Sequence, residues 1–273
     1  MKKILLVLIA TLAFNQAIFA GFPIGKGRFL LVPSYNFYRA NGYWDNNRLY
    51  TAYPNNGKFT SNYFGIYFGA GISRNLDFVG SLPFVIQTET STGKLNSVAG
   101  IGDIKLGLSY FLSHFNENTH LSTTGSLILP GYQNNLTPFI GFGSFGTEIK
   151  IGVAGSTQKY YRNPYFDIEG GLTQYFNTFG PSQLFANVTG GIPLSEQIKI
   201  SGTVSTVNSM SAETAFNSSN LSYNRNFSYT RITAAVGYTV DKTWALWGNI
   251  YTDVTGKSIG RGSGLSIFAV IKF

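Results

Sequence analysis

The stretch Thr230–Val240 reads TRITAAVGYTV, and it decides the fold class because its residues alternate in character at almost every step. In an extended chain, Ile232 and Val236 fall on one face, while Arg231 and Thr233 fall on the other. A period of two residues indicates a β-strand with one apolar face and one polar face.

The same alternation recurs along the chain after residue 27. Gly102–Leu112 (GDIKLGLSYFL) and Leu265–Phe273 are clear further examples, because aliphatic side chains recur at every second position. From this pattern we predict twelve strands. Their expected bounds are 27–39, 60–72, 76–89, 100–113, 119–130, 146–157, 164–177, 182–193, 197–208, 228–240, 243–254 and 263–273.

The expected connections alternate between short turns and longer polar loops. The clearest turns fall at 73–75, 115–118, 193–196 and 241–242, and the longest loops at 40–59, 90–99, 131–145 and 209–227. This alternation is typical of an outer-membrane barrel, with tight periplasmic turns and longer external loops. We therefore predict an all-β fold, an antiparallel transmembrane β-barrel of about 12 strands with both termini periplasmic. The alternative is a soluble β-sandwich, in which strands this long would leave extended exposed edges.

The composition excludes several other classes of protein. Only 12% of the 273 residues are charged, against about 25% in a typical soluble domain. The chain has no cysteine, so a disulfide framework and a thiolate metal site are excluded. The net charge of +8 comes from scattered basic residues without a basic patch, so we predict no nucleic-acid partner. We expect no metal site. We also expect no cofactor, because the string Gly141-x-Gly143-x-x-Gly146 precedes a strand, whereas a dinucleotide fingerprint opens a helix.

The first twenty residues have the order of a secretory signal peptide. Lys2 and Lys3 precede an apolar run over 4–14, and Ala20 supplies a small residue at the expected cleavage point. That run is shorter than the roughly 20 residues that a membrane-spanning helix needs. We predict a signal peptide at 1–20 and an outer-membrane β-barrel at 21–273, exported to the cell outer membrane. The alternative for the first segment is a buried N-terminal helix.

Short motifs resemble a known family of outer-membrane barrels. Gly100–Tyr110 (GIGDIKLGLSY) is similar to its glycine–aspartate signature, and Gly69–Val85 (GAGISRNLDFVGSLPFV) to its hairpin with a Leu-Pro-aromatic step. Leu129-Pro130-Gly131 resembles its proline–glycine strand exit, and the terminal Phe273 resembles the C-terminal signal of outer-membrane proteins in general. The chain thus resembles the outer-membrane β-barrel transporter family labelled a component of phenol degradation (the meta-pathway). The resemblance covers about residues 25–273 and implies barrel transport of small molecules, hydrophobic ones included.

His120 and Ser122 are the candidates for an enzymatic site. A histidine two residues from a serine recurs in outer-membrane lipases and deacylases, and this spacing puts both side chains on one strand face. Leu121, Leu127 and Leu129 occupy the opposite face, so we expect the pair to point into the lumen, away from membrane lipid. We therefore predict that the protein is not an enzyme.

Charged residues on the expected inner face are the candidate site residues, because they would line the pore. By alternation these are Glu89, Asp103, Lys105, Glu148, Lys150, Asp167, Glu169, Lys199, Arg231 and Asp253. Their mixed signs allow two interpretations: ion pairs that brace the barrel, or a role in selecting what passes. Twelve strands enclose a narrow lumen, and the aromatic residues expected to crowd it are Phe111, Phe185, Trp247, Tyr251 and Phe268.

These features predict an outer-membrane channel or transporter for passive uptake of small molecules, hydrophobic or aromatic ones included. One alternative is a binding or structural barrel that acts through the expected external loops 40–59 and 209–227. The other is a lipid-modifying enzyme of the outer membrane. The expected partners are outer-membrane lipid and lipopolysaccharide, the barrel-assembly machinery and a small-molecule solute.

Overall fold

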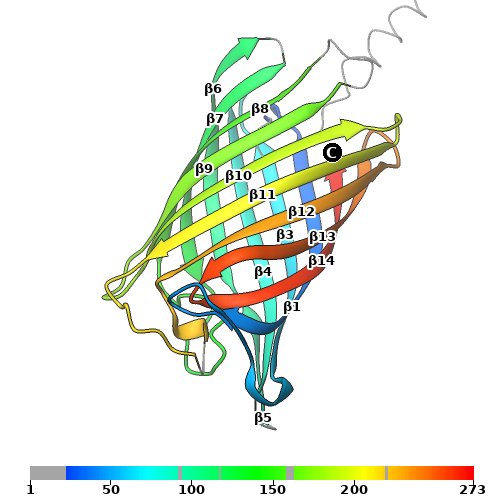
Figure 1. The fold of residues 1–273 in the computed structure, drawn as a ribbon. Coiled ribbons are helices and arrows are strands. Elements are labelled where there is room, and N and C mark those ends of the chain that lie inside the picture. The colour runs from blue at the N-terminus through cyan, green and yellow to red at the C-terminus, as the bar shows by residue number, and fades with distance from the viewer. Residues whose placement is uncertain (1–22, 92–93, 117, 158–162, 219–220) are drawn as a thin grey trace, which may run out of the picture.

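The strands of the computed structural model form one antiparallel sheet that closes on itself as a barrel (Figure 1). The structure describes residues 23–91, 94–116, 118–157, 163–218 and 221–273, so the predicted signal peptide at 1–20 lies outside the described residues. The strands are β1 (Phe29–Trp44), β2 (Tyr50–Ala52), β3 (Lys58–Gly71), β4 (Leu76–Ser91), β5 (Lys94–Ile101), β6 (Asp103–Asn116), β7 (Thr119–Pro130), β8 (Gly146–Ser156), β9 (Tyr165–Tyr175), β10 (Ser182–Pro193), β11 (Ile198–Met210), β12 (Phe227–Thr239), β13 (Trp244–Lys257) and β14 (Ile259–Lys272). Two short 3₁₀ turns, η1 (Pro54–Asn56) and η2 (Leu221–Tyr223), lie in loops. Among the described residues, no helix is long and apolar enough to cross a membrane.

Twelve strands make up the barrel wall. The sheet has 14 strands in total, but β2 is a short addition paired with the end of β1. Strands β5 and β6 pair in succession with the same neighbour, β4, and so occupy one place in the wall. The barrel closes where β1 pairs antiparallel with β14, from Leu30↔Lys272 to Trp44↔Ile259. We call this pairing the seam.

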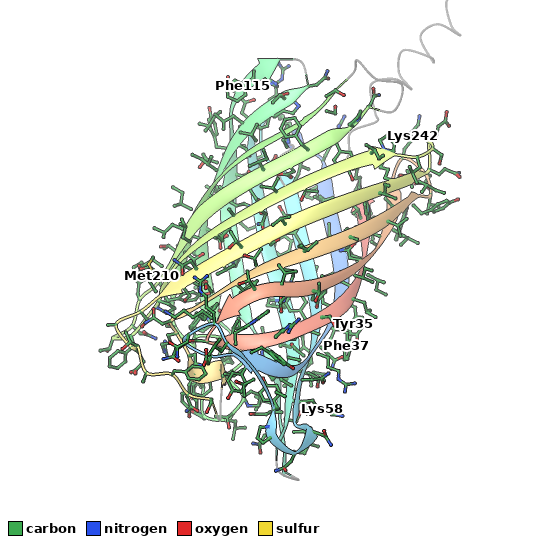
Figure 2. The ribbon with its side chains drawn as sticks, viewed as in Figure 1. Tyr35, Phe37, Lys58, Phe115, Met210 and Lys242 are labelled. Atoms are coloured by element: carbon green, nitrogen blue, oxygen red, sulfur yellow. The ribbon has the colours of Figure 1, made fainter. Side chains whose placement is uncertain are left out.

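The barrel has two different ends. Short turns and the C-terminus lie at one end, which we call the short-turn end; Phe115 and Lys242 mark it in Figure 2. The longer connections gather at the opposite end, which we call the loop end, close to Met210 and Lys58 (Figure 2). The described chain enters and leaves the barrel at the same end, because Phe29 and Phe273 exchange backbone hydrogen bonds of 3.1 and 2.9 Å.

The outer face of the wall is apolar. Large hydrophobic side chains are exposed on alternate positions of each strand, as the sequence pattern predicts, among them Ile149, Ile151, Ile232, Val236 and Ile250. In water so broad an apolar surface would promote aggregation, whereas a bilayer buries it. The outer face therefore has the character that a lipid-facing wall requires.

The strand bounds differ from the predicted ones mainly at the loop end. The stretch 90–99, predicted as a polar loop, continues β4 and β5 as a paired hairpin beyond the wall, with Ser91 opposite Lys94. The predicted loop 40–59 contains the end of β1 and all of β2. The last two strands are longer than the predicted 243–254 and 263–273, because β13 and β14 meet around Ser258, a single residue at φ 53°. Strands that rise above the bilayer have no lipid-facing side, so their sequence loses the apolar alternation that identifies a strand.

Candidate functional site

The barrel lumen holds a series of adjoining cavities. The central cavity has a volume of about 490 Å³ and is lined mainly by polar residues of β3, β4 and β6–β12. The seam cavity, about 500 Å³, lies inside β1, β3 and β12–β14. The mouth cavity, about 300 Å³, lies under the loops at the loop end, and the basal cavity, about 310 Å³, lies toward the short-turn end. Arg231 lines the mouth, central and seam cavities, so it stands where three of them meet.

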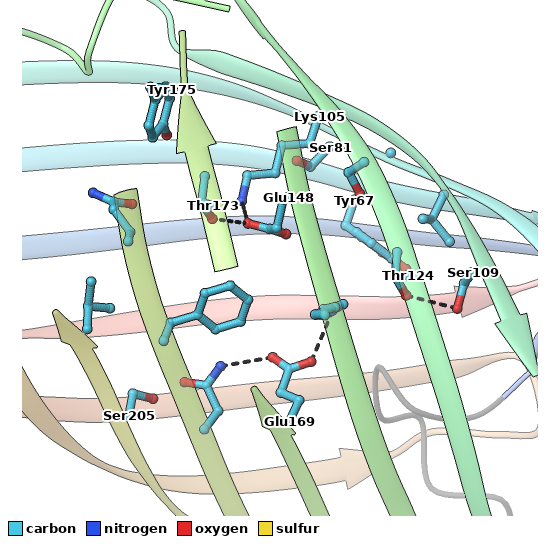
Figure 3. Close-up of a pocket in the computed structure, with 18 of the residues that line it drawn as sticks. Tyr67, Ser81, Lys105, Ser109, Thr124, Glu148, Glu169, Thr173, Tyr175 and Ser205 are labelled. Atoms are coloured by element: carbon cyan, nitrogen blue, oxygen red, sulfur yellow. Dashed lines mark hydrogen bonds and ion pairs between the residues drawn. The ribbon is translucent and has the colours of Figure 1, made fainter. Parts of the chain in front are cut away.

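A ladder of ion pairs crosses one wall of the central cavity (Figure 3). Lys105 Nζ on β6 lies 2.5 Å from Glu148 Oε2 on β8, which also accepts a hydrogen bond of 3.0 Å from the Thr173 hydroxyl. Lys150 Nζ lies 3.0 Å from Glu169 Oε2 on β9. The structure therefore brings together four predicted site residues, and their opposite charges pair within the wall instead of standing on opposite sides of the lumen.

Glu169 extends this ladder to the next strand. Its second carboxylate oxygen accepts a hydrogen bond of 2.9 Å from Asn187 Nδ2 on β10. The ladder thus links β6, β8, β9 and β10 across their inner faces, and each acidic group has two partners. This geometry shows ion pairs that link strands of the wall, and a role of the charges in selecting what passes stays a prediction.

Arg231 forms a second polar cluster on the opposite side of the lumen, which we call the arginine clamp. Its guanidinium contacts Asp253 through two hydrogen bonds, 2.8 Å from Nε and 3.3 Å from Nη2. The rings of Tyr251, Tyr38 and Tyr229 surround it at 4.4, 5.4 and 5.5 Å from the guanidinium carbon. The Tyr38 hydroxyl donates a further hydrogen bond of 2.9 Å to Asp253, so β1, β12 and β13 meet at one charge pair.

The third polar cluster anchors the loop 131–145 under the mouth. The Tyr132 hydroxyl donates a hydrogen bond of 2.9 Å to Asp103 and accepts one of 2.9 Å from the Gly143 backbone N–H. The Tyr175 hydroxyl donates a hydrogen bond of 3.3 Å to the other Asp103 oxygen. Burial, and then the neighbouring carboxylate of Asp103, raise the pKa of Tyr132 well above its ordinary value, so this hydroxyl stays protonated and able to donate.

Two loops from different parts of the chain meet over the barrel opening. The Phe139 backbone N–H donates a hydrogen bond of 2.9 Å to the Ser222 hydroxyl, and the Phe139 and Tyr223 rings lie 4.4 Å apart. Phe142 packs on Tyr175 with ring centroids 4.6 Å apart. The mouth is therefore narrowed by folded loops with aromatic contacts, and these loops form part of the lining of the mouth cavity.

The remaining predicted site residues occupy separate places. Glu89 lines the mouth cavity, and Asp167 lines the basal cavity, where it is buried. Lys199 is half-buried on β11 at the short-turn end and lines none of these four cavities. Of the predicted aromatic residues, Phe185, Tyr251, Trp247 and Phe268 line cavities of the lumen.

His120 and Ser122 do not face membrane lipid. Both are buried, and their strand neighbours of the same parity, Thr124 and Ser126, line the central cavity. The His120 ring nitrogen Nδ1 lies 3.0 Å from Nδ1 of His114 on β6. This geometry excludes a lipid-facing serine at this position and agrees with the sequence expectation for the pair.

The short-turn end has a feature that alternation did not reveal. Residues 23–28 precede β1, and the Ile24 backbone N–H donates a hydrogen bond of 2.8 Å to the buried carboxylate of Asp77. A side chain at Gly69 or Gly71 would collide with this segment, at Ile24 or at Gly25 respectively. Two glycines of β3 therefore make room for chain inside the barrel.

Sequence reasoning also missed several residues of the polar clusters. Tyr38 belongs to no motif in the sequence, although its ring and hydroxyl both contact the arginine clamp. Tyr132 lies in a loop without any distinguishing motif. A usable signal existed for Tyr38, because it has the inward parity of its strand, as the predicted Tyr251 does.

Known proteins resemble this chain in structure. No family model matches the sequence, and no curated protein matches it. The crystal structure of the COG4313 outer membrane channel from Pseudomonas putida F1 superposes with a TM-score of 0.75 at 14% identity, over 95% of this chain and 100% of that one. The fold is that of an outer-membrane β-barrel. This confirms the predicted fold class, an all-β antiparallel barrel of twelve strands.

More distant barrels show the same fold. The translocator domain of autotransporter NalP from Neisseria meningitidis has a TM-score of 0.53 at 11% identity, over 97% of this chain and 92% of that one. The NanC porin has a TM-score of 0.50 at 5% identity, over 89% and 98%. At these identities the likeness extends to the barrel fold. The phenol-degradation label of the resembling family stays a prediction.

Proposed function

We propose that the protein is an outer-membrane channel for passive uptake of small molecules, hydrophobic and aromatic ones included. The observation that carries this proposal is the series of adjoining lumen cavities, in which Arg231 joins the mouth cavity to the central and seam cavities. An outer membrane channel and a porin among the structural neighbours support the same role.

The lining of the mouth cavity supports the substrate class. Its walls include the rings of Phe59, Phe139, Phe142 and Phe227, so a solute with an apolar body finds contact there that bulk water does not offer. The central cavity beyond it is mostly polar, with hydroxyl, amide and paired charged groups. A small aromatic molecule would bind in the mouth cavity and then pass through the more polar central cavity.

The proposed setting is the outer membrane of a Gram-negative cell. The apolar outer face would contact lipid and lipopolysaccharide, and the short-turn end would face the periplasm, as it does in barrels with long external loops. A signal peptide at 1–20 would direct export, and the barrel-assembly machinery would insert the chain. The inward fold of loop 131–145 and its contact with η2 favour a pore function over an external binding surface.

The test is solute flux through purified protein in liposomes. We expect swelling to be faster with benzyl alcohol than with a sugar of similar mass, and we expect discrete single-channel steps in a planar bilayer. Absence of both swelling and conductance would overturn the proposal. Deletion of residues 211–218 should leave flux in place; loss of a cell-surface function with unchanged flux would instead favour the binding alternative.

A further inference from the structure

The charged residues that line the mouth cavity sum to one negative charge; Arg225, whose guanidinium carbon lies 5.9 Å from the centroid of the Phe142 ring, is outside this lining. The charged lining residues are Glu89, Arg231 and Asp253. Arg231 and Asp253 neutralise each other through the two hydrogen bonds of the arginine clamp. Glu89 is left over, and the three charges sum to −1 because two carboxylates face one guanidinium.

Glu89 has no partner within the part of the chain that the structure describes. It lies on β4 opposite Phe59 of β3 and Asn96 of β5, and no hydrogen bond or ion pair reaches its carboxylate from another described residue. The other acidic residues of the wall differ in this respect, since Glu148 and Glu169 each accept two hydrogen bonds. A half-buried carboxylate without a partner favours a ligand that supplies positive charge or a hydrogen-bond donor.

Gln87 adds a second acceptor to the same lining. It precedes Glu89 by two residues on β4, so both side chains point to the same face, and both line the mouth cavity. The Gln87 carbonyl oxygen is buried and has no hydrogen-bond partner in the structure. Gln87 and Glu89 therefore stand side by side in the lining, Glu89 half-buried and Gln87 with its carbonyl oxygen fully buried.

Aromatic rings stand around these acceptors. Phe59 is the direct cross-strand neighbour of Glu89, and its ring lies 6.3 Å from that of Tyr38 in an edge-to-face arrangement. Tyr53 lines the same cavity. The negative faces of aromatic rings attract organic cations, and aromatic cages with a carboxylate are a recurrent way to bind substituted ammonium groups.

We infer that the mouth cavity binds organic ammonium ions with an aromatic or other apolar body, and that Glu89 is the residue that selects their charge. The inference rests on the proposed channel function and names the substrate class that its outer site prefers. Aromatic carboxylates of the same size are disfavoured, because the positive charge of Arg231 is already neutralised and Glu89 repels them.

Three probes with the same aromatic body test the charge preference: phenethylammonium, 2-phenylethanol and phenylacetate. Binding to the full chain in detergent micelles is measured by titration calorimetry at one pH and salt concentration. We expect phenethylammonium to bind about tenfold more tightly than phenylacetate, with 2-phenylethanol between them. Equal affinities, or tighter binding of phenylacetate, would overturn the inference.

Two variants locate the preference. Glu89→Gln keeps the size of the side chain and should reduce the advantage of phenethylammonium over 2-phenylethanol to within about twofold. Glu196→Gln removes an exposed carboxylate at the short-turn end and should leave the preference unchanged. Retention of the full preference in Glu89→Gln would also overturn the inference. Heat-modifiability in gel electrophoresis shows that each variant is a folded barrel.

A parallel flux measurement separates this inference from the proposed function. Liposomes that swell with all three probes, together with equal binding affinities, would leave the channel function standing and remove the ammonium site. Selective binding of phenethylammonium without flux of any solute would support the site and remove the channel function.

Discussion

The substitution Asp253→Asn tests the energetics of the arginine clamp. The carboxylate accepts two hydrogen bonds from Arg231, at 2.8 and 3.3 Å, and one from Tyr38 at 2.9 Å. The Asp253 side chain is 3% exposed and that of Arg231 29% exposed, so the guanidinium keeps some access to water after the change. An asparagine preserves the shape but leaves Arg231 without its counter-ion.

The expected loss follows from these contacts. Removal of one partner from a buried ion pair costs about 3–5 kcal/mol. Partial hydration of Arg231 and its contact with the Tyr251 ring at 4.4 Å offset about 1–2 kcal/mol of that cost. We therefore expect the free energy of unfolding to fall by about 2–3 kcal/mol in Asp253→Asn.

The assay is urea unfolding of the barrel in phospholipid vesicles, followed by the fluorescence of its three tryptophans. The double variant Arg231→Met with Asp253→Leu removes both charges and should recover at least half of the loss, because no unpaired ion remains. Glu196→Gln is the control for loss of an exposed carboxylate. A change in Asp253→Asn of under about 0.5 kcal/mol, or a double variant less stable than the single one, would refute the reasoning.

Three further predictions concern the ladder, the wall and the loop anchor. Glu148→Gln leaves the charge of Lys105 unpaired, and at about 5 Å from the path of a passing ion that charge contributes at least about 0.8 kcal/mol. We therefore expect the reversal potential in a KCl gradient to shift toward anions, by a several-fold change in permeability ratio. An unchanged potential would contradict a selectivity role for the ladder. Gly237→Ala should lower the free energy of unfolding in urea by about 1–3 kcal/mol, because the added Cβ would lie 2.5 Å from the Trp247 ring, whereas at Gly248 it would meet nothing within 4 Å and serves as control. The raised pKa of Tyr132 means that its contribution to stability is complete below pH 10, the ordinary value, and declines above it as only the unfolded chain ionises. Tyr132→Phe should make unfolding less sensitive to pH above 10, and an unchanged pH dependence would count against a buried, protonated hydroxyl.

Periodicity was sufficient for the wall of the barrel. The expected strand 228–240 corresponds to β12 at Phe227–Thr239, and the expected strand 182–193 matches β10. Lipid on one side and water on the other impose a period of two on every residue within the bilayer, so the pattern is dense and local. The hairpin around 90–99 has no lipid on either side and both its faces are polar, so its sequence lacks the period of two. The sequence therefore predicted a loop where the structure has paired strands.

The polar clusters could be predicted only in part. Alternation placed Lys105 and Glu148 on the inner face, but their pairing depends on the stagger of neighbouring strands. Asp103 meets Tyr132 and Tyr175, which are 29 and 72 residues away along the chain, and nothing in the local sequence specifies such partners. Which side chains meet in the lumen thus depends on the register between paired strands. Turn lengths and long-range strand pairing together determine that register.

The seam has a consequence for the order of assembly. Tyr38 reaches Asp253 across 215 residues of chain, and it does so because β1 pairs with β14. Contacts between the first and last strands carry the highest loop-closure cost and form late in folding. An intermediate with the seam still open would hold Arg231 and Asp253 on adjacent strands, but it would lack the Tyr38 hydroxyl that completes the arginine clamp. The last step of barrel formation therefore also completes the polar cluster around Arg231 and Asp253, so a chain arrested before closure has a wall but not the finished lining of the lumen.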